Sequence, residues 1–420
     1  MSSDAIEVAP VDEVVVIGTG FVGLPLALVL AEQGTQVYGV DIDENLVDAI
    51  NDASLKLNSG EFHTRLEDET VQANLEASME PTAGDAFVIS VPTPLQEPSK
   101  SPDLSYVEAA IKSILPYLDG GELINIESTI PPLTCERTVI PILKDAGFEP
   151  GTDIQLAHSP ERILPGNVFE EIVTNDRVIG GINRESALRA AKIYDPFLEG
   201  EIYFTDLTSA ELCKLMENTF RDVNVALANE FALIGGEMDV NMDHVIDLAN
   251  NHPRVDILNP GIGVGGHCLP VDPWFLNEVD PEHTNLITTA RRINDKMPDV
   301  TAKKVRRAVA SYDTPKIVAL GATYKPNTYD QRNSPAQKVV NSLSLDGYDI
   351  HHYDRHVDGM GYDDLKSLIE DERPDVLLQL VPHDNTNRAI NKNRDWFVSN
   401  DIELIRFGEA KTPTQPLSKP

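Results

Sequence analysis

The sequence predicts an α/β protein in which two Rossmann-like, doubly wound parallel-sheet domains are joined by a helical central region with a long helix. Short β-branched runs alternate with helical patterns at both ends of the chain, which is typical of parallel sheets. Between these two blocks, a helical pattern without proline runs from Leu207 to about Met238. The length of 420 residues exceeds what one ordinary core contains, so more than one domain is expected.

The two alternating blocks and the long helix define the expected elements. The predicted strands of the first block are Val14–Ile17, Gln36–Val40, Ala86–Val91, Leu123–Glu127 and Ile154–Ala157. Its predicted helices are Leu24–Gln33, Glu44–Asn51, Leu104–Leu118 and Thr134–Ala146. Later in the chain a helix is predicted over Ala290–Val309, and strands over Ile317–Leu320, Tyr348–Tyr353 and Val376–Leu380. We expect Thr208 or Ser209 to cap the long helix.

The composition excludes several classes of partner. Acidic residues number 68 against 34 Lys and Arg, and a net charge of −34 makes nucleic acid a poor partner. This acidity is spread along the chain and resembles the surface of a halophilic protein. No apolar run has the length of a membrane span and the N-terminus is polar, so we expect no membrane contact and a cytoplasmic location. Cys135, Cys213 and Cys268 form no CxxC pair, so neither a disulfide framework nor a metal site is expected.

A dinucleotide-binding fingerprint lies between the first predicted strand and the first predicted helix. In the segment Gly18–Gly23, Gly18 allows a tight turn, Gly20 lets the backbone approach a pyrophosphate, and Gly23 lets the helix pack on the strand. Asp41 ends the second strand about 20 residues further on, where a carboxylate binds ribose hydroxyls. Because that carboxylate would repel a 2′-phosphate, the cofactor expected is NAD.

A glycine- and proline-rich loop carries the chemistry expected of a reactive thiol. Four glycines and three prolines fall in Pro260–Pro273, and Cys268 follows His267 and precedes Asp272 within this loop. Glycines permit close approach of a ligand to the backbone. A reactive thiol needs a cationic or hydrogen-bonding partner, whereas Cys135 and Cys213 have the pattern of small buried hydrophobes.

The long helix supplies polar partners for that thiol. Lys214, Asn218 and Arg221 fall at positions i, i+4 and i+7, on one helix face. Their neighbours are apolar, which predicts a largely buried helix: Leu212, Cys213, Leu215 and Met216. Cations buried there require anionic partners such as a phosphate, a carboxylate or an oxyanion.

Seven ordered motifs now give a family resemblance. They are the GxGxxG turn, Ser90-Val-Pro-Thr93-Pro, Glu127-Ser-Thr129, Pro160-Glu161-Arg162-Ile-Leu-Pro-Gly166, Glu211-Leu-Cys-Lys214-Leu-Met-Glu-Asn218, Gly-Gly-His-Cys268 and Gly321-Ala-Thr-Tyr324-Lys325-Pro. From about Val14 to His383 the chain resembles the UDP-glucose/GDP-mannose dehydrogenase superfamily. Pro270-Val-Asp272 after the cysteine and His252-Pro-Arg254-Val make it most similar to the members that oxidise UDP-N-acetyl-D-mannosamine.

The resemblance implies a role for each matching position. Cys268 would be the nucleophile, Lys214 and Asn218 would stabilise an oxyanion, and the residues that position or activate water would be Glu161, Thr129 and Asp272. The implied UDP-sugar ligands, besides Lys214 and Asn218, are Arg162, Ile163, Arg221, His252, Arg254, Gly265, Tyr324 and Lys325. The implied NAD ligands, besides the glycines, are Val22, Asp41, Thr93, Thr129 and Arg332.

The resemblance also implies an organisation and a reaction. Residues 1–200 would bind NAD, 201–310 would form a central dimerisation and catalytic region, 311–408 would bind the UDP-sugar, and 409–420 would form a flexible tail. A homodimer is implied, with the loop of Arg254 reaching the neighbouring subunit. The implied reaction oxidises the sugar C6 hydroxyl to a carboxylate with two NAD, through a thiohemiacetal and a thioester on Cys268.

Three alternatives remain open at the level of sequence. The alternative most similar to the implied function is the same reaction on UDP-N-acetylglucosamine or UDP-glucose. A two-electron 3-hydroxyacid dehydrogenase shares the Rossmann start and the long helix but needs no cysteine. A silent nucleotide-sugar-binding protein is disfavoured because Cys268, Lys214 and Asp272 occur together.

Overall fold

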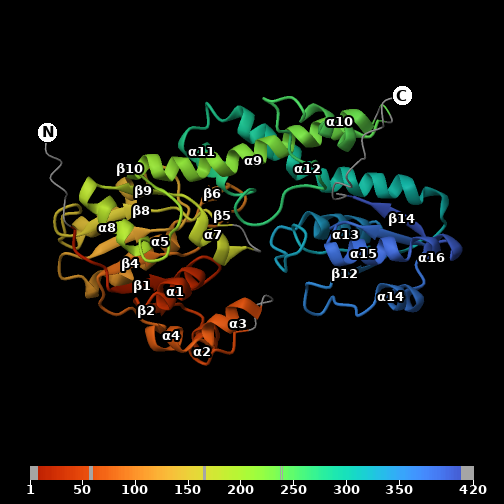
Figure 1. Ribbon diagram of the computed structural model, residues 1–420. Helices are drawn as coiled ribbons and strands as arrows, with labels where there is room; N and C mark the ends of the chain where they lie inside the picture. The colour runs from red at the N-terminus through yellow and green to blue at the C-terminus, as the bar shows by residue number, and fades with distance from the viewer. Residues whose placement is uncertain (1–7, 56–59, 164–166, 237, 239, 408–420) are drawn as a thin grey trace. The chain divides into compact units, whose positions relative to one another are not determined.

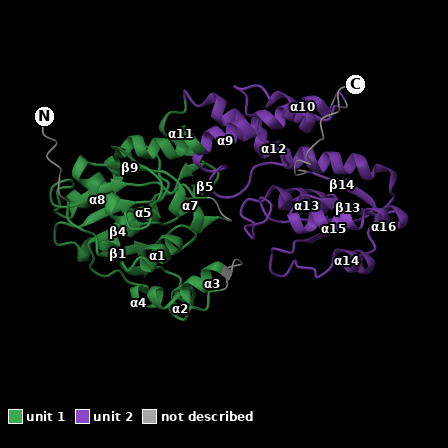
Figure 2. Cartoon of the chain, in the orientation of Figure 1, with its two compact units in different colours: residues 1–217, 274–281 green, residues 218–273, 282–420 purple. Residues whose placement is uncertain are grey.

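The computed structural model describes residues 8–55, 60–163, 167–236, 238 and 240–407 (Figure 1). The expected tail 409–420 and residues 164–166 of the Pro-Glu-Arg motif lie outside the described residues. The chain forms two compact units (Figure 2): unit 1 contains residues 1–217 and 274–281, and unit 2 contains residues 218–273 and 282–420. Within the described ranges, no helix is both long and apolar enough to cross a membrane.

Unit 1 is built around an eight-stranded sheet with the order β10-β9-β8-β7-β4-β1-β2-β3. Its strands are β1 (Glu13–Ile17), β2 (Gln36–Val40), β3 (Leu75–Ser78), β4 (Ala86–Ile89), β7 (Leu123–Ile126), β8 (Gln155–His158), β9 (Arg177–Gly181) and β10 (Ile202–Asp206). A small hairpin joins β5 (Leu95–Gln96) to β6 (Ser101–Pro102). The helices are α1 (Gly23–Glu32), α2 (Glu44–Asn51), α3 (Gly60–Leu66), α4 (Glu69–Asn74), α5 (Ser105–Ile114), α6 (Ile140–Asp145), α7 (Val168–Thr174) and α8 (Arg184–Tyr194).

Alternation of side chains along the strands gives this sheet a core on each face. Val14 and Val16 of β1 pack with α1 and α8 on one face. Val15 and Ile17 pack with α5 and α6 on the other. Both faces are therefore covered by helices, as parallel sheets require.

The order of the strands places a topological switch point at the carboxyl end of β1. β1 pairs in parallel with β2 on one side and with β4 on the other, so the chain reverses its winding direction at this strand. Ligands of open α/β sheets bind at such a switch point. The Gly18–Gly23 turn follows β1 directly and therefore lies at this point.

Unit 2 combines central helices with a second, four-stranded parallel sheet of order β12-β11-β13-β14. The strands are β11 (Lys316–Leu320), β12 (Asp349–Tyr353), β13 (Val376–Gln379) and β14 (Glu403–Arg406). Its helices are α10 (Met242–Ala249), α12 (Asn285–Ala308), α13 (Pro335–Leu345), α14 (Leu365–Glu372), α15 (Asp384–Lys392) and α16 (Arg394–Ser399). Two helices cross from one unit to the other: α9 (Leu207–Gly236) and α11 (Asp272–Val279).

The predicted fold class is confirmed, but the direction of two strands and the cap of the long helix differ from the prediction. The pairing of β8 with β9 is antiparallel, so β9 and β10 run against the rest of the sheet. The long helix is capped by Asp206, whose carboxylate accepts hydrogen bonds from the backbone N–H and the hydroxyl of Ser209; neither Thr208 nor Ser209 is the cap. These bonds hold the pKa of Asp206 below its usual range.

The prediction that the long helix is largely buried is correct for only part of its surface. Leu215 is fully buried, but the exposed fractions of Leu212 and Met216 are 36% and 62%. Helical periodicity cannot tell whether an apolar stripe faces the core of its own chain or remains open.

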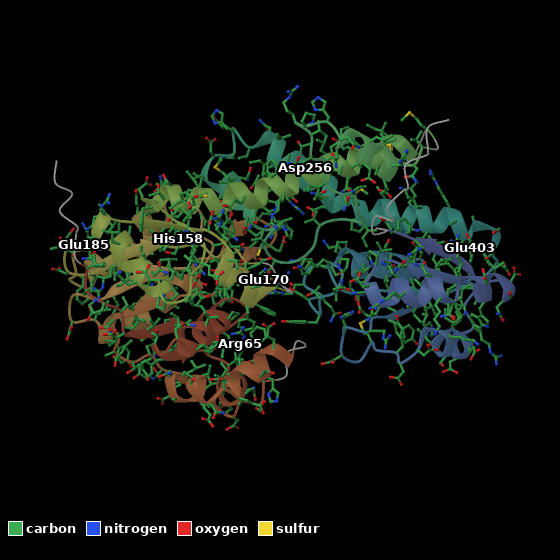
Figure 3. All side chains as sticks on the ribbon, in the orientation of Figure 1. Arg65, His158, Glu170, Glu185, Asp256 and Glu403 are labelled. Carbon is green, nitrogen blue, oxygen red and sulfur yellow. The ribbon has the colours of Figure 1, made fainter. Side chains whose placement is uncertain are left out.

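Many acidic residues lie on the exposed surface of both units. Glu170 and Glu185 of unit 1 and Asp256 of unit 2 are examples of exposed carboxylates (Figure 3). Their distribution agrees with the spread of acidic residues along the sequence.

Candidate active site

The glycine turn of unit 1 has the geometry of a phosphate-binding turn. Gly18 has a φ of +92°, and a Cβ there would collide with the carbonyl oxygen of Ser90. A Cβ on Gly23 would collide with the carbonyl oxygen of Gly18. A Cβ on Gly20 would meet no atom within 4 Å, so this position faces the open space that a pyrophosphate needs. The space around each glycine is thus compatible with its position in the fingerprint.

The first turn of α1 leaves its backbone donors available for an anion. Val22 precedes the helix without a capping hydrogen bond from a side chain, and the first turn contains no acidic residue. The N–H groups and the positive end of the helix dipole therefore favour a bound phosphate. These features fit the diphosphate of NAD.

Asp41 lies at the end of β2, beside the same turn. Its carboxylate accepts hydrogen bonds from the backbone N–H of Thr19 at 2.9 Å and from the Thr19 hydroxyl at 3.2 Å. It also accepts one from the N–H of Asp43 at 3.1 Å. The carboxylate is half-buried and fixed in orientation, as expected of a group that selects ribose hydroxyls.

Two predicted residues meet where β4 and β7 end. The Thr93 hydroxyl donates to the carbonyl oxygen of Thr129 at 2.7 Å. The Ser128 hydroxyl donates to the carbonyl oxygen of Val91 at 2.8 Å and accepts from the N–H of Val91 at 2.9 Å. The structure therefore brings Thr93 and Thr129 together at the carboxyl edge of the sheet.

Lys214 and Glu161 form a buried ion pair in unit 1. Lys214 Nζ on α9 lies 3.8 Å from Glu161 Oε2 on the segment after β8, and both side chains are at most 11% exposed. One turn earlier on α9, the buried carboxylate of Glu211 accepts hydrogen bonds from the backbone N–H groups of Leu133 and Cys135. Glu211 therefore fixes the loop that follows Thr129. The sequence motif includes Glu211, but it did not predict this role.

Arg162 and Ile163 have protein partners in the structure. The Arg162 guanidinium donates to both carboxylate oxygens of Glu217, at 3.2 and 2.6 Å, and to the carbonyl oxygen of Asp176. Ile163 is partly buried against the core of unit 1. Arg162 can therefore reach a phosphate only if it shares its donors with Glu217.

The cysteine loop is fixed within unit 2 by contacts with the segment after β11. The N–H of Gly266 donates to the carbonyl oxygen of Arg332, and the Asn333 side chain donates to the carbonyl oxygen of Gly266, both at 2.9 Å. A Cβ on Gly265 would collide with Tyr324 and Pro335. Glycine is therefore required at position 265 for packing.

These contacts present a half-buried thiol next to an imidazole. Cys268 Sγ lies 3.1 Å from His267 Nδ1. The carbonyl oxygen of Cys268 accepts hydrogen bonds from the N–H groups of Val271 and Asp272, which continue into α11. These bonds fix the backbone of Cys268 to the residues that lead into α11.

A hydrogen-bonded chain of three predicted residues lies in the same unit. The Asn218 amide donates to the Asp272 carboxylate, and Arg221 donates to the Asn218 side-chain oxygen. Asn218 and Asp272 are 1% and 3% exposed. Because Asp272 follows Cys268 on one loop, this chain connects α9 to the cysteine loop.

Tyr324 and Arg332 contact the same loop at Gly265 and Gly266. Burial, with Asp330 and Cys268 nearby, raises the pKa of Tyr324 to about 12, so the phenol remains neutral. Arg332 donates to both oxygens of Asp330, at 2.9 and 2.6 Å. Lys325 is half-buried on this segment. The structure thus places Arg332, a predicted NAD ligand, beside the cysteine loop of unit 2.

His252 and Arg254 differ from the other predicted ligands because they are exposed. They follow α10, and the N–H of Arg254 donates to His252 Nδ1 at 3.3 Å. Their side chains face solvent on the surface of unit 2.

Three further ionisable side chains, those of His158, Cys135 and Cys213, have pKa values that make them unsuitable as a base or a nucleophile near pH 7. Burial lowers the pKa of His158 on β8 to about 3, so this imidazole (Figure 3) is neutral and cannot act as a base near pH 7. Burial raises the pKa values of the Cys135 and Cys213 thiols, which keeps both protonated. Among the described residues, no group of three or more His, Cys, Asp or Glu side chains could hold a metal ion.

Comparison with known families decides the identity of this arrangement. The NAD binding domain of the UDP-glucose/GDP-mannose dehydrogenase family matches residues 12–198, the central domain residues 208–296, and the UDP binding domain residues 318–391. The chain belongs to the UDP-glucose/GDP-mannose dehydrogenase family. It is therefore an NAD-dependent oxidoreductase, as the sequence predicts.

Individual members of this family show which branch is similar. A UDP-N-acetyl-D-mannosamine dehydrogenase of Methanocaldococcus jannaschii is 46% identical, covering 93% of this chain and 90% of its own. An NDP-N-acetyl-D-galactosaminuronic acid dehydrogenase of Ralstonia solanacearum is 43% identical, and the match covers 78% of this chain and 79% of that relative. The structure of UDP-D-ManNAc dehydrogenase from Pyrococcus horikoshii superposes with a TM-score of 0.87 at 38% identity, covering 97% and 98% of the two chains.

Proposed function

We propose that this chain oxidises UDP-N-acetyl-D-mannosamine at C6 to UDP-N-acetyl-D-mannosaminuronate with two NAD. The observation that carries the chemistry is the position of the Cys268 thiol, beside His267 and on one loop with Asp272, which Asn218 holds. The sugar is inferred from the similar relatives, which act on UDP-N-acetyl-D-mannosamine.

The thiol solves the main difficulty of an alcohol-to-acid oxidation. NAD accepts a hydride in each of the two oxidation steps. Cys268 as thiolate adds to the aldehyde formed in the first step, which prevents its escape. The resulting thiohemiacetal loses its hydride in the second step and becomes a thioester, which water cleaves to release the acid and the thiol.

We assign charge stabilisation and water activation to further residues that the sequence predicts. Each addition to the carbonyl carbon creates an oxyanion, for which Lys214 and Asn218 are the proposed donors. Water must lose a proton to attack the thioester, and Glu161 is the proposed base, with Thr129 and Asp272 positioning the water.

The UDP-sugar needs cations despite the acidic surface. We assign this role to Arg221, Arg254 and Lys325, with Tyr324, His252, Ile163 and Gly265 lining the ligand. Arg162 already pairs with Glu217, so it would contribute donors to the UDP-sugar while remaining bound to that carboxylate. Arg332, which pairs with Asp330, would do the same for NAD.

We propose that the active form is a homodimer. Leu212, Met216, Phe220, Leu227 and Ile234 of α9 are between 36% and 66% exposed and recur every four or seven residues. Such a stripe on one helix matches the self-complementary surface of a twofold dimer. The loop that carries the exposed Arg254 would then reach the neighbouring subunit. Phe220→Glu should halve the mass measured by light scattering; an unchanged dimer would exclude this stripe as the interface.

Two further assignments accompany the function. We propose that the reaction takes place in the cytoplasm. We also propose residues 1–200, 201–310 and 311–408 as the NAD-binding, central catalytic and UDP-sugar-binding divisions.

The decisive experiment measures NADH formed per UDP-sugar consumed, in high salt, with UDP-N-acetyl-D-mannosamine, UDP-N-acetylglucosamine and UDP-glucose offered separately. Two NADH per UDP-N-acetyl-D-mannosamine, with slow turnover of the other sugars, is the expected result. Two NADH on another sugar would overturn the substrate and keep the mechanism. One NADH per turnover would indicate a two-electron dehydrogenase and overturn the proposal.

A further inference from the structure

A second buried carboxylate, that of Glu127, lies in unit 1 and has no role in the chemistry described above. Glu127 follows β7 directly and is 1% exposed. Its Oε1 accepts a hydrogen bond from Arg177 NH1 of β9 at 3.1 Å, and the Arg177 side chain is 7% exposed. Its Oε2 has no hydrogen-bond partner within the part of the chain that the structure describes. A buried ion pair joined by a single hydrogen bond is a poor source of stability, so another function explains it better.

The position of Glu127 connects it to the proposed base. β7 and β8 are adjacent and parallel, with Ile126 paired to His158, so Glu127 and Ser159 leave the sheet side by side. Glu161 follows two residues later and lies 3.8 Å from Lys214 Nζ. Glu127 with Arg177 and Glu161 with Lys214 therefore form two buried ion pairs at the carboxyl edge of the sheet.

We propose that Glu127 is a positioning residue for the hydrolysis step, because its negative charge, held by Arg177, balances the cations at this edge and keeps Glu161 basic enough to activate water. The inference rests on the proposed function. Without the Glu127 charge, the cations would outnumber the anions, and a proton would bind to Glu161 less tightly.

The titration of Glu127 agrees with this role. Burial raises the pKa of Glu127 to about 7, opposed by Arg177 and reinforced by Glu161. The groups that face it are Arg177 of β9, Tyr194 of α8 and Glu161, and the Arg177 guanidinium lies 4.0 Å from the centre of the Tyr194 ring. Since its pKa is raised, Glu127 is neutral below about pH 7 and supplies its charge above it.

The test is the pH profile of kcat for UDP-N-acetyl-D-mannosamine oxidation in the wild type, Glu127→Gln, Arg177→Met and the double variant. In the wild type, kcat should fall as the pH drops through about 7, where Glu127 loses its charge, and Glu127→Gln should abolish this limb and keep kcat at the lower, acid-side level. Arg177→Met removes the cation that favours the charged carboxylate, so the limb should move to higher pH. The double variant, which also lacks the Glu127 carboxylate, should have no such limb.

The loss of the limb in one variant and its shift in the other separate electrostatics from structural damage. A loss of folding would lower kcat at every pH without removing or moving the limb, and Glu127→Asp, which keeps the charge, should retain it. Circular dichroism and Tm identify any variant that does not fold. A limb that stays near its wild-type pH in a folded Glu127→Gln, or one that does not rise in a folded Arg177→Met, would overturn the role of Glu127. Failure of the wild type to make NADH from any UDP-sugar would instead overturn the proposed function.

Discussion

The two glycine-rich loops of this chain use glycine for opposite purposes. In the Gly18–Gly23 turn of unit 1, the middle glycine faces open space, and the first turn of the following helix has no capping side chain. In the cysteine loop of unit 2, Gly265 lies where a Cβ would collide with Tyr324 and Pro335. The first loop leaves space for a ligand at Gly20, whereas the second loop uses the missing side chain of Gly265 to pack against its own unit.

This difference suits the first loop to binding an anion and the second loop to holding a nucleophile. An anion site needs unpaired N–H groups at a helix start, so its glycines must leave them accessible. A nucleophile needs a fixed position, so the glycines before Cys268 let the loop be clamped by Asn333 and Arg332. Variants of the two loops should therefore affect different measurements, and four of them test this separation.

Cys268→Ala should have the largest effect. Loss of the thiol should reduce uronate formation by more than about 10³-fold, because the aldehyde can no longer be held covalently. NAD and UDP-sugar binding, measured by calorimetry, should remain. Cys213→Ala, which removes a half-buried thiol with a raised pKa, is the matched control. Acid formed at the wild-type rate would exclude the covalent mechanism.

Asn218→Ala should have the second-largest effect on turnover. It removes a proposed oxyanion donor and leaves the buried Asp272 carboxylate without the Asn218 amide, so kcat should fall by about 10²–10³-fold. Asn224→Ala on the same helix, where the amide donates to the Phe220 carbonyl oxygen one turn earlier, is the control and should retain activity. Steady-state kinetics distinguish them: an equal fall in both variants would indicate general damage to α9.

Gly20→Ala tests the open space of the first loop. The added methyl group meets no protein atom, so Tm should change little, but it should block the pyrophosphate and weaken NAD binding by roughly 10- to 100-fold. Gly361→Ala, which likewise meets nothing within 4 Å, is the control in unit 2. Calorimetric titration with NAD gives the comparison, and unchanged affinity would show that the pyrophosphate lies elsewhere.

Asp41→Ala should have the smallest effect. Loss of the ribose-binding carboxylate should weaken NAD binding roughly tenfold and reduce discrimination against NADP. Asp48→Ala, an exposed carboxylate on α2, should leave the ratio of NAD to NADP affinities unchanged. If Asp41→Ala also leaves that ratio unchanged, Asp41 does not contact the ribose.

Periodicity and motif spacing predict the parts of the structure that depend on local sequence. The strand Gln36–Val40 and the helix Glu44–Asn51 have the predicted bounds, and the glycine turn has the predicted geometry. In contrast, the helices α10 and α11 were missed because they are short and follow or precede segments rich in Gly, Pro and Asn.

Properties that depend on distant partners could not be predicted. The pairing of Arg162 with Glu217 and the burial of Glu127 against Arg177 join residues far apart in sequence. The motifs contained Glu127 and Glu211, but only the fold shows what each carboxylate contacts.

The environments of the three cysteines have a practical consequence. Two thiols are kept protonated by raised pKa values, and the third lies half-buried beside an imidazole. A thiol-specific alkylating reagent at neutral pH should therefore label one site per chain. Incorporated label then reports the molar concentration of competent enzyme in any preparation, independently of turnover.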